Sequence, residues 1–270
     1  EKKSVNPKYE RAFVINYFIA NSYFQLGMYN KSIKYFENSL SPDNDEGWNN
    51  GIYDQLSIAY ERIGGYEKVI ELMKKLLPDA HNENDPKKYS IIYTRFAYSY
   101  QQLGKMDSAK ENYDKAIEQD PNNWSAHNNL GLVFQELGEY QKAIDSYKKL
   151  CQAQPDSANA HQNLGRLYMV LGDTKKAVDS YLVALKYEPE NLVYYYHLVD
   201  LNKEILDLKL KNKIDRILYD RNCTKENLAY GNFLLSKYEQ KSKNYEKEFN
   251  YLLKGHQYYF KTEEKKNEKQ

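Results

Sequence analysis

Cysteine is scarce in this sequence, and its placement gives no basis for a disulfide scaffold or a zinc site. The 270 residues contain two cysteines, Cys151 and Cys223, which lie far apart and match neither kind of spacing. Cys151 falls on the apolar stripe of a predicted helix, where a free cysteine behaves as a small hydrophobic residue. We therefore expect no redox role and no metal site.

An excess of charge and long apolar runs are also missing. The formal net charge is +1, whereas binding to nucleic acid or to an anionic membrane requires a clustered basic face. The longest apolar runs, such as residues 12–20, are interrupted by Asn16 and are shorter than the ~20 residues of a membrane-spanning helix. We expect neither a nucleic-acid partner nor insertion into a membrane.

Motifs that carry catalysis or cofactor binding do not occur. The sequence contains no HExxH, CxxC, GxxxxGK or GxGxxG, and no Ser, His and acid arrangement can be argued from spacing. We expect no catalytic residue and no cofactor, so that this chain by itself is not an enzyme.

Prolines are few, and three of the seven mark a regular period. Pro121, Pro155 and Pro189 recur with a 34-residue period, and the residues between them keep the same register. A fixed period of this length indicates a solenoid of stacked units. Apolar residues recur at helical spacing in two segments of each copy, which predicts two amphipathic helices joined by a tight turn. The residue before each proline is biased out of the helical region, so each proline marks a repeat boundary.

Small residues recur at two places in this pattern. Gly138 and Gly172 follow the leucine that ends a first helix, where glycine adopts the left-handed conformation without a Cβ penalty. Other small residues stand where two antiparallel helices must approach closely, in the pairs Ala20–Ser32, Ala97–Ala109, Gly131–Ala143 and Gly165–Ala177. His127 and His161 are one period apart and therefore occupy the same place on separate helices, which argues against a shared metal ion.

The middle copy has the spacing of a known repeat. The residues that define it are His127, Leu130-Gly131, Phe134, Leu137-Gly138, Tyr140, Ala143, Tyr147 and Pro155. This run resembles the tetratricopeptide repeat (TPR), with its W-x2-L-G-x2-Y…A-x3-F…P pattern. The resemblance implies an all-α, right-handed α-solenoid, a superhelix whose first helices line a concave groove. We expect about seven helix-turn-helix pairs, five of them recognisable as TPR.

The helical pattern extends along most of the chain as a single predicted solenoid, residues 1–260. Regular repeats are expected at about 9–41, 46–80, 90–123, 124–157 and 158–191, followed by divergent helical pairs at 192–225 and 226–260. A polar linker over residues 78–88 exceeds the period by about six residues and is either a lateral contact or slack. Residues 261–270 should form a charged tail, either a solvated helix end or disordered.

Polar side chains on the first helices are the candidate peptide contacts. We select Asn21, Gln55, Arg95, Tyr98, Asn128, Asn129, Gln162, Asn163 and Arg166. A carboxamide can both donate to and accept from a peptide backbone, which offers one group of each kind per residue. In similar proteins an asparagine ladder at this place holds peptide backbone, and Asn129 and Asn163 match it by residue type. The alternative is that these side chains only solvate the groove.

Two functions remain open. The first is a scaffold that binds an extended peptide or a partner helix in the groove. The second is the substrate-recruiting arm of a larger transferase, of sulfotransferase or glycosyltransferase type, because residues 228–260 resemble the last helical pair of repeat-bearing sulfotransferases. Either function implies a protein or peptide partner, and we expect a monomer or weak dimer. The sequence begins at Glu1 without a signal-like apolar region, so the cytoplasm is the default compartment, with a removed targeting segment as the alternative.

Overall fold

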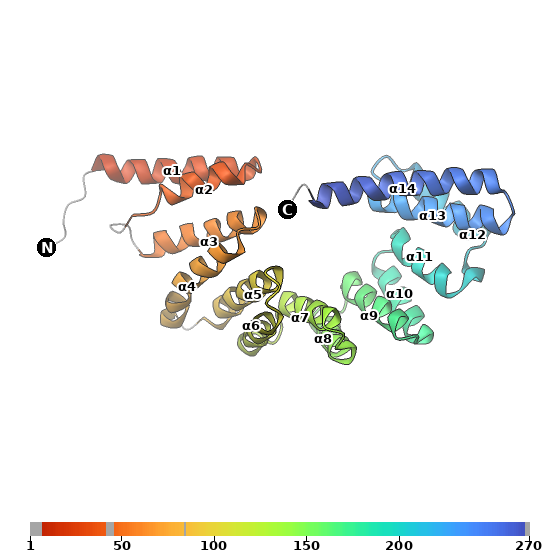
Figure 1. Cartoon of the computed structure of the whole chain (residues 1–270), viewed down its shortest axis with the longest axis horizontal. Coiled ribbons are helices and arrows are strands. Elements are labelled where there is room, and N and C mark those ends of the chain that lie inside the picture. Colours follow the sequence, from red (N-terminus) through yellow and green to blue (C-terminus); the bar gives the residue numbers. More distant parts are fainter. Residues whose placement is uncertain (1–6, 42–45, 84, 268–270) are drawn as a thin grey trace. The chain divides into compact units, whose positions relative to one another are not determined.

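The computed structural model describes residues 7–41, 46–83 and 85–267, and all of its regular structure is helical (Figure 1). Within these residues the helices follow one another as antiparallel pairs joined by short turns. The pairs are α1 (Pro7–Gln25) with α2 (Tyr29–Glu37), α3 (Glu46–Arg62) with α4 (Tyr66–Glu83), α5 (Pro86–Gln102) with α6 (Met106–Gln119), α9 (Ala158–Val170) with α10 (Thr174–Tyr187), α11 (Leu192–Leu201) with α12 (Leu208–Tyr219), and α13 (Lys225–Lys241) with α14 (Tyr245–Asn267). Between the third and fourth of these pairs the chain forms α7 (Trp124–Glu136) and α8 (Tyr140–Ala153). The predicted all-α fold of paired helices is confirmed.

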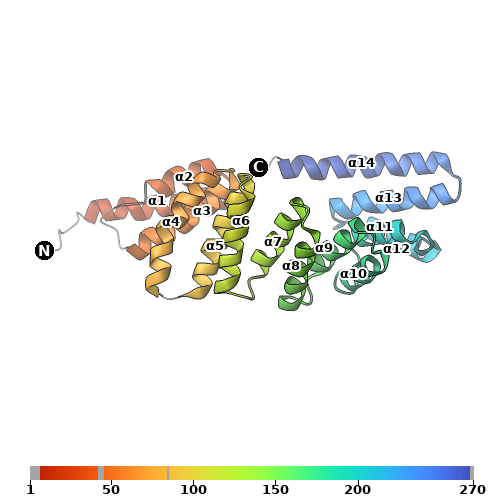
Figure 2. The ribbon, with the colours of Figure 1, turned by 60° about the horizontal axis from the view of Figure 1, so that its bottom comes forward.

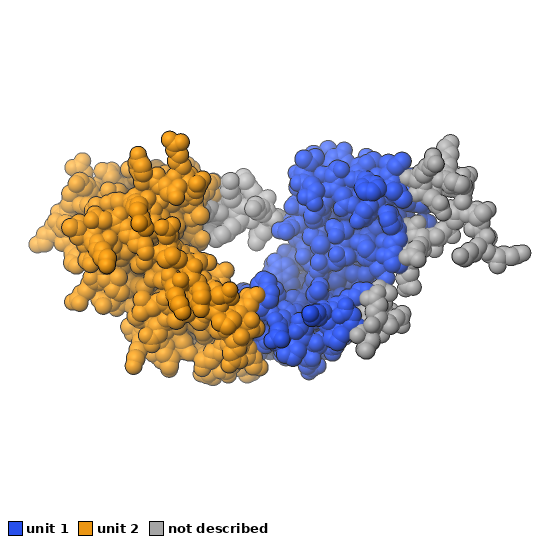
Figure 3. Space-filling model, turned by 180° about the vertical axis from the view of Figure 1, so that it is seen from behind, with its two compact units in different colours: residues 1–138, 270 blue, residues 139–269 orange. Residues whose placement is uncertain are grey.

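The chain forms two compact units, residues 1–138 and residues 139–269 (Figure 3). The boundary falls at the turn between α7 and α8, inside the fourth predicted pair. In unit 1 each helix from α1 to α6 packs against the helix that follows it. In unit 2 the same holds for α8, α9 and α10, and α13 packs against α11, α12 and α14. Each unit therefore has a core of its own.

The 34-residue period appears in the hydrogen bonds that begin the first helices. Asn123, Ser157 and Asn191 are the N-caps of α7, α9 and α11, and each follows the previous one by a single period. Their side chains accept hydrogen bonds from the backbone N–H groups of Ala126, Ala160 and Val193 at 3.0, 3.4 and 3.0 Å. Each bond satisfies one of the N–H groups that a helix N-terminus leaves without an intrahelical partner.

A second repeated contact joins three first helices, α7, α9 and α11, to the proline before each of them. The Nε2 atoms of His127 and His161 lie 2.9 and 3.2 Å from the carbonyl oxygens of Pro121 and Pro155, and the Tyr195 hydroxyl donates to the Pro189 carbonyl at 3.4 Å. The two histidines therefore hold the repeat boundary. Among the described residues no cluster of His, Cys, Asp and Glu could hold a metal ion.

Glycines close the turns inside the pairs. Gly138 and Gly172 have φ angles of 74° and 76°, as predicted, and Gly27, Gly64 and Gly104 take the same conformation. In the last pair, Lys243 has a φ of 57° in the turn between α13 and α14, where the sequence offers no glycine. A side chain in this conformation is strained because its Cβ crowds the following carbonyl.

Replacement of Gly172 by alanine is expected to lower the free energy of unfolding by about 1 kcal/mol, because alanine must adopt a positive φ at this turn. No atom lies within 4 Å of the added Cβ, so the loss comes from the backbone alone. Urea denaturation measures it. A variant as stable as the parent chain would show that the turn can adopt another conformation without loss.

Small residues lie at the helix crossings for the three predicted pairs that fall within one unit. Ala97 and Ala109 are fully buried between α5 and α6. The Ser32 hydroxyl donates to the Ala20 carbonyl at 3.0 Å, which joins α2 to α1 inside the core. A Cβ added at Gly165 would lie 2.9 Å from Cζ of Tyr181, whose ring is fully buried on α10. The α9 backbone and the Tyr181 ring therefore leave no space for a larger residue at position 165.

The predicted linker over residues 78–88 is wrong for most of its length. Helix α4 continues to Glu83 and α5 begins at Pro86, so the extra residues lengthen helices. Pro86 starts a helix because the Asp85 side chain caps it, accepting from the N–H groups of Lys87 and Lys88 at 3.0 and 3.2 Å. At the C-terminus, α14 carries the predicted charged tail as helix up to Asn267, and residues 268–270 lie outside the described residues.

No helix in the described part of the chain is long and apolar enough to cross a membrane.

Candidate functional site

All nine predicted groove residues lie on the first helix of a pair. Unit 1 carries Asn21 on α1, Gln55 on α3, Arg95 and Tyr98 on α5, and Asn128 and Asn129 on α7; unit 2 carries Gln162, Asn163 and Arg166 on α9. Arg166 is exposed and the other eight are half-buried. The two sets belong to different units, and each is described by its own contacts.

In unit 1, a buried tyrosine holds the amide side chains of α5 and α7 in place. Tyr113 on α6 is fully buried, and its hydroxyl donates to Oε1 of Gln101 at 3.0 Å and is also hydrogen-bonded to the Asn129 side chain. Asn129 accepts from Nδ2 of Asn128 at 3.2 Å, and Gln101 donates to Oε1 of Glu136 at 3.4 Å. Burial raises the pKa of Tyr113, which keeps the hydroxyl protonated. The network fixes the direction of the carboxamides.

Arg95 links two first helices of unit 1. Its Nη1 atom lies 2.9 Å from Oδ1 of Asp54 and also bonds the Ser57 hydroxyl, while its Nε lies 3.9 Å from Oε1 of Glu61. The Arg95 side chain is 20% exposed, so most of its surface is covered. The prediction that Arg95 presents a guanidinium to a ligand overlooked these three partners on α3.

The other predicted residues of unit 1 divide between internal contacts and solvent. Nδ2 of Asn21 donates to the Tyr17 carbonyl of its own helix at 3.0 Å. The Tyr98 ring packs edge to face against the Tyr66 ring, and the two ring centroids are 6.0 Å apart. Gln55 makes no hydrogen bond within the described part of the chain, so its carboxamide is available to a ligand.

In unit 2, the row of groove residues continues beyond the predicted repeats. Tyr196, His197 and Asp200 on α11 follow Gln162, Asn163 and Arg166, in that order, by one 34-residue period each. We name these six residues the α9–α11 row. The Leu-Gly signature that marks the candidate positions is absent from the sixth pair, although the 34-residue spacing itself would have found them.

The α11 part of this row is held by ring contacts and one ion pair. His197 stacks on Tyr181 with ring centroids 5.1 Å apart, and burial lowers the pKa of His197, which favours the neutral imidazole at neutral pH. Lys237 of α13 lies over the Tyr196 ring, 3.8 Å from its centroid, and also bonds the Asp200 carboxylate. Aromatic faces, an imidazole and charged groups are therefore fixed side by side.

A hollow of about 480 Å³ adjoins the row between α11 and α13. Asp200, Lys203, Lys237 and Lys241 line it, so that lysines outnumber carboxylates by three to one. Val199, Leu206 and Gln240 complete its wall. The hollow is suited to a short acidic side chain beside an apolar surface.

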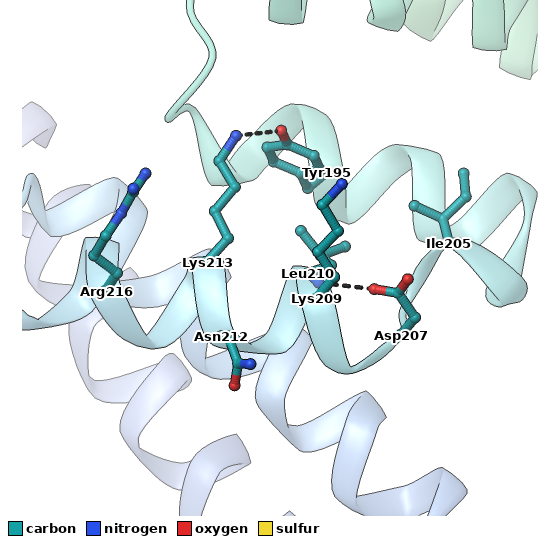
Figure 4. Close-up of a pocket in the computed structure, with 8 residues that line it drawn as sticks. All are labelled: Tyr195, Ile205, Asp207, Lys209, Leu210, Asn212, Lys213 and Arg216. Atoms are coloured by element: carbon teal, nitrogen blue, oxygen red, sulfur yellow. Dashed lines mark hydrogen bonds between the residues drawn. The ribbon is translucent and has the colours of Figure 1, made fainter.

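A second basic hollow, of about 670 Å³, lies between α11 and α12 (Figure 4). Lys209, Lys213 and Arg216 point to the same side of α12, whereas Asn212 points away from it. The Lys213 ammonium donates to the Tyr195 hydroxyl at 2.6 Å and lies 4.8 Å from the ring centroid. The three basic side chains suit an anion such as a carboxylate, but no feature of this hollow selects one anion over another.

Cys151 has the environment of a packing residue. Its Sγ lies 3.8 Å from Nδ1 of His161, and burial raises its thiol pKa to about 11. The thiol is therefore protonated at neutral pH and is a weak nucleophile.

Family models of the tetratricopeptide repeat match the chain over residues 14–45, 94–158 and 134–200, which together cover about half of it. The matched ranges include four of the five predicted regular repeats. They stop at residue 200, where the Leu-Gly signature is lost. This family consists in general of non-catalytic scaffolds for protein interactions. The predicted resemblance of residues 228–260 to sulfotransferase repeat arms is not shown.

Solved structures share this fold. A crystal structure of MamA has a TM-score of 0.54 and 24% identity, covering 68% of this chain and 95% of MamA. TTC0263, a TPR protein of Thermus thermophilus, has a TM-score of 0.50 and 22% identity, covering 70% of this chain and 98% of its own. YrrB, described as a TPR protein with an unusual peptide-binding site, has a TM-score of 0.50 and 15% identity, covering 67% of this chain and 89% of YrrB. At these identities the likeness concerns the fold.

One curated relative matches part of the chain. The Sol locus transcriptional repressor of Clostridium acetobutylicum is 38% identical over 88 residues, which are 32% of this chain and 26% of the repressor. The match therefore spans about a quarter of that protein's length.

Proposed function

Because this chain is a tetratricopeptide repeat protein, we propose that it is a scaffold that binds an extended acidic peptide along the first helices of unit 2. The observation that carries this proposal is the α9–α11 row, in which α9 supplies two amides and a guanidinium and α11 supplies a phenol ring, an imidazole and a carboxylate. The family in general binds protein partners, and the row supplies groups that recognise a peptide.

Each part of the row suits one part of a peptide. The carboxamide of Gln162 can donate to and accept from peptide backbone, and no hydrogen bond occupies it within the described residues. One face of the Tyr196 ring carries the Lys237 ammonium, and the half-buried rings of Tyr230 and Phe233 beside it offer apolar surface to peptide side chains. Arg166 is exposed and pairs with no carboxylate of the described chain, which makes it a partner for Asp or Glu.

The sign of the charge selects the peptide. Arg166, Lys237, Lys203 and Lys241 stand on or beside the row, and Asp200 is the single carboxylate that lines the adjoining hollow. A basic peptide would be repelled here, whereas an acidic one is attracted, more strongly at low salt. The peptide-binding description of YrrB concerns a protein of the same fold and supports this kind of function. If the chain were the arm of a larger transferase, the same surface would recruit its substrate.

Arg166→Glu tests this proposal. Peptides are first selected on the whole chain from a random display library, and their dissociation constants are then measured by fluorescence anisotropy. We expect the selected peptides to be rich in Asp and Glu and the variant to bind them at least ~10-fold more weakly, since an attractive charge becomes a repulsive one. Arg166 is exposed, so thermal stability should be unchanged.

The matched control is Arg221→Glu, the same charge change at an exposed residue between α12 and α13. It should leave the dissociation constants within about twofold of the parent chain. Selected peptides without acidic residues, or equal binding by Arg166→Glu and the parent chain, would refute the proposal.

A further inference from the structure

The last helix of unit 2 has an apolar stripe whose side chains are all exposed. Helix α14 packs on α13 along one side (Figure 2). Its packed side includes Gly255, where a Cβ would lie 2.5 Å from the Phe233 ring, so the two helices are in close contact. A different side carries the stripe, formed by Tyr245, Phe249, Leu252, Leu253, His256 and Phe260.

A large part of each of these side chains is exposed to solvent. Tyr245, Phe249 and Phe260 are 68%, 64% and 62% exposed, and Leu252 and Leu253 are 40% and 48% exposed. Single exposed apolar residues are normal, but a contiguous row of them marks an interaction surface.

The stripe is symmetric about its own midpoint, which falls between Leu252 and Leu253. Phe249 comes three residues before Leu252, and His256 comes three residues after Leu253. Tyr245 comes seven residues before Leu252, and Phe260 comes seven residues after Leu253. In a two-fold symmetric interface residue i of one copy contacts residue j of the other and j contacts i, so a symmetric stripe places residues of similar size opposite each other.

We propose that α14 pairs with α14 of a second copy of this chain, antiparallel and with midpoint on midpoint. This arrangement places Phe249 opposite His256 of the second copy and Tyr245 opposite Phe260. Charge favours the same orientation. Glu246, Lys247 and Glu248 give the part of α14 before Leu252 a net charge of −1, whereas Lys254 and Lys261 give the part after Leu253 a net charge of +2. An antiparallel pair brings unlike halves together, and a parallel pair brings like halves together.

The size of the stripe predicts a weak dimer. Six mostly large side chains at these exposures bury roughly 600 Å² per copy, below the ~800 Å² of a standard interface. We therefore expect a dissociation constant on the order of micromolar, so that the dimer forms and dissociates within an accessible range of concentrations.

Sedimentation velocity of the whole chain, over ~1 to 200 µM, tests the pairing because it gives the mass of the sedimenting species at each concentration. The parent chain should pass from monomer to dimer, and Phe249→Glu should remain a monomer at every concentration. The control is Asn250→Glu, which makes the same charge change at the next exposed residue on a different side of α14. It should dimerise like the parent chain. Circular dichroism and the melting temperature of each variant show that it is folded.

A compensating variant tests the register. In the antiparallel pair, Phe249→Glu of one copy faces position 256 of the other, so the double variant Phe249→Glu/His256→Lys should regain at least half of the lost association. A parent chain that stays monomeric to ~200 µM would overturn the proposal, as would a folded Phe249→Glu variant that dimerises like the parent. Failure of the double variant to regain association would overturn the antiparallel register.

Discussion

Replacement of Gly165 by leucine is expected to lower the free energy of unfolding by about 3 kcal/mol, at the upper end of the usual loss from overpacking. Even the first added atom would lie 2.9–3.1 Å from three atoms of the Tyr181 ring. That ring cannot move aside freely, because it stacks on His197 and its hydroxyl contacts Sδ of Met169 at 3.4 Å. The added side chain must therefore push α9 away from α10.

Urea denaturation followed by circular dichroism measures this loss. The control is Gly51→Ala on α3, where no atom of the described chain lies within 4 Å of the new Cβ. That substitution should be neutral or stabilise the chain by up to about 1 kcal/mol, because alanine favours the helix over glycine. If Gly165→Leu is as stable as the parent chain, the two helices of this pair do not approach as closely as described.

Replacement of Arg95 by alanine is expected to lower the free energy of unfolding by about 2 kcal/mol at neutral pH, because it breaks a partly buried ion pair. The guanidinium contacts Asp54, Ser57 and Glu61 at once. Oε1 of the half-buried Glu61 has no hydrogen-bond donor among the described residues, so removal of the guanidinium takes away a positive charge that offsets the burial of this carboxylate. Breaking a fully buried pair costs about 3–5 kcal/mol, and the partial exposure of these side chains reduces that figure. Arg221→Ala, at an exposed position, should change stability by less than about 0.5 kcal/mol.

The loss should depend on pH in a stated direction. Burial raises the pKa of the Glu61 carboxyl above its ordinary 4.5, and the Arg95 guanidinium opposes that rise. A carboxyl with a raised pKa favours the folded state at low pH, and this contribution is lost as pH rises through the folded-state pKa. Removal of Arg95 raises the Glu61 pKa further. The variant therefore loses more stability than the parent chain as the pH rises. The difference between variant and parent should be largest at neutral pH and should shrink as the pH falls toward the ordinary carboxyl pKa, and a constant difference would show that Glu61 does not contribute.

The repeat architecture could be predicted because the same physical requirement recurs with a 34-residue period. Prolines at the boundaries, left-handed glycines such as Gly138, and small residues such as Ala97 each answer a local need of the backbone or of one helix crossing. The linker at residues 78–88 could not be predicted this way. Pro86 in this segment follows a capping Asp85, and the same residue types that end one helix begin the next.

The candidate site was predictable in position and less so in chemistry. Helical spacing places Arg95 and Asn163 on first helices, which is correct, but it does not say which partners lie on the neighbouring helix. Arg95 forms an ion pair with Asp54, and this pair exists only because α3 and α5 lie close enough together. His197 and Asp200 lacked a sequence signature, although they keep the 34-residue period, because the sixth pair has lost its Leu-Gly.

Site-specific photocrosslinking tests the central claim, that the first helices of unit 2 bind a peptide. Benzoylphenylalanine is introduced at Gln162 on α9 and, in a second variant, at Leu182 on α10, which is 52% exposed. Each variant is irradiated with the acidic peptide that binds the parent chain most tightly. We predict a crosslink from position 162 and none from position 182. A crosslink from position 182 alone, or none from position 162 while binding persists, would contradict the account.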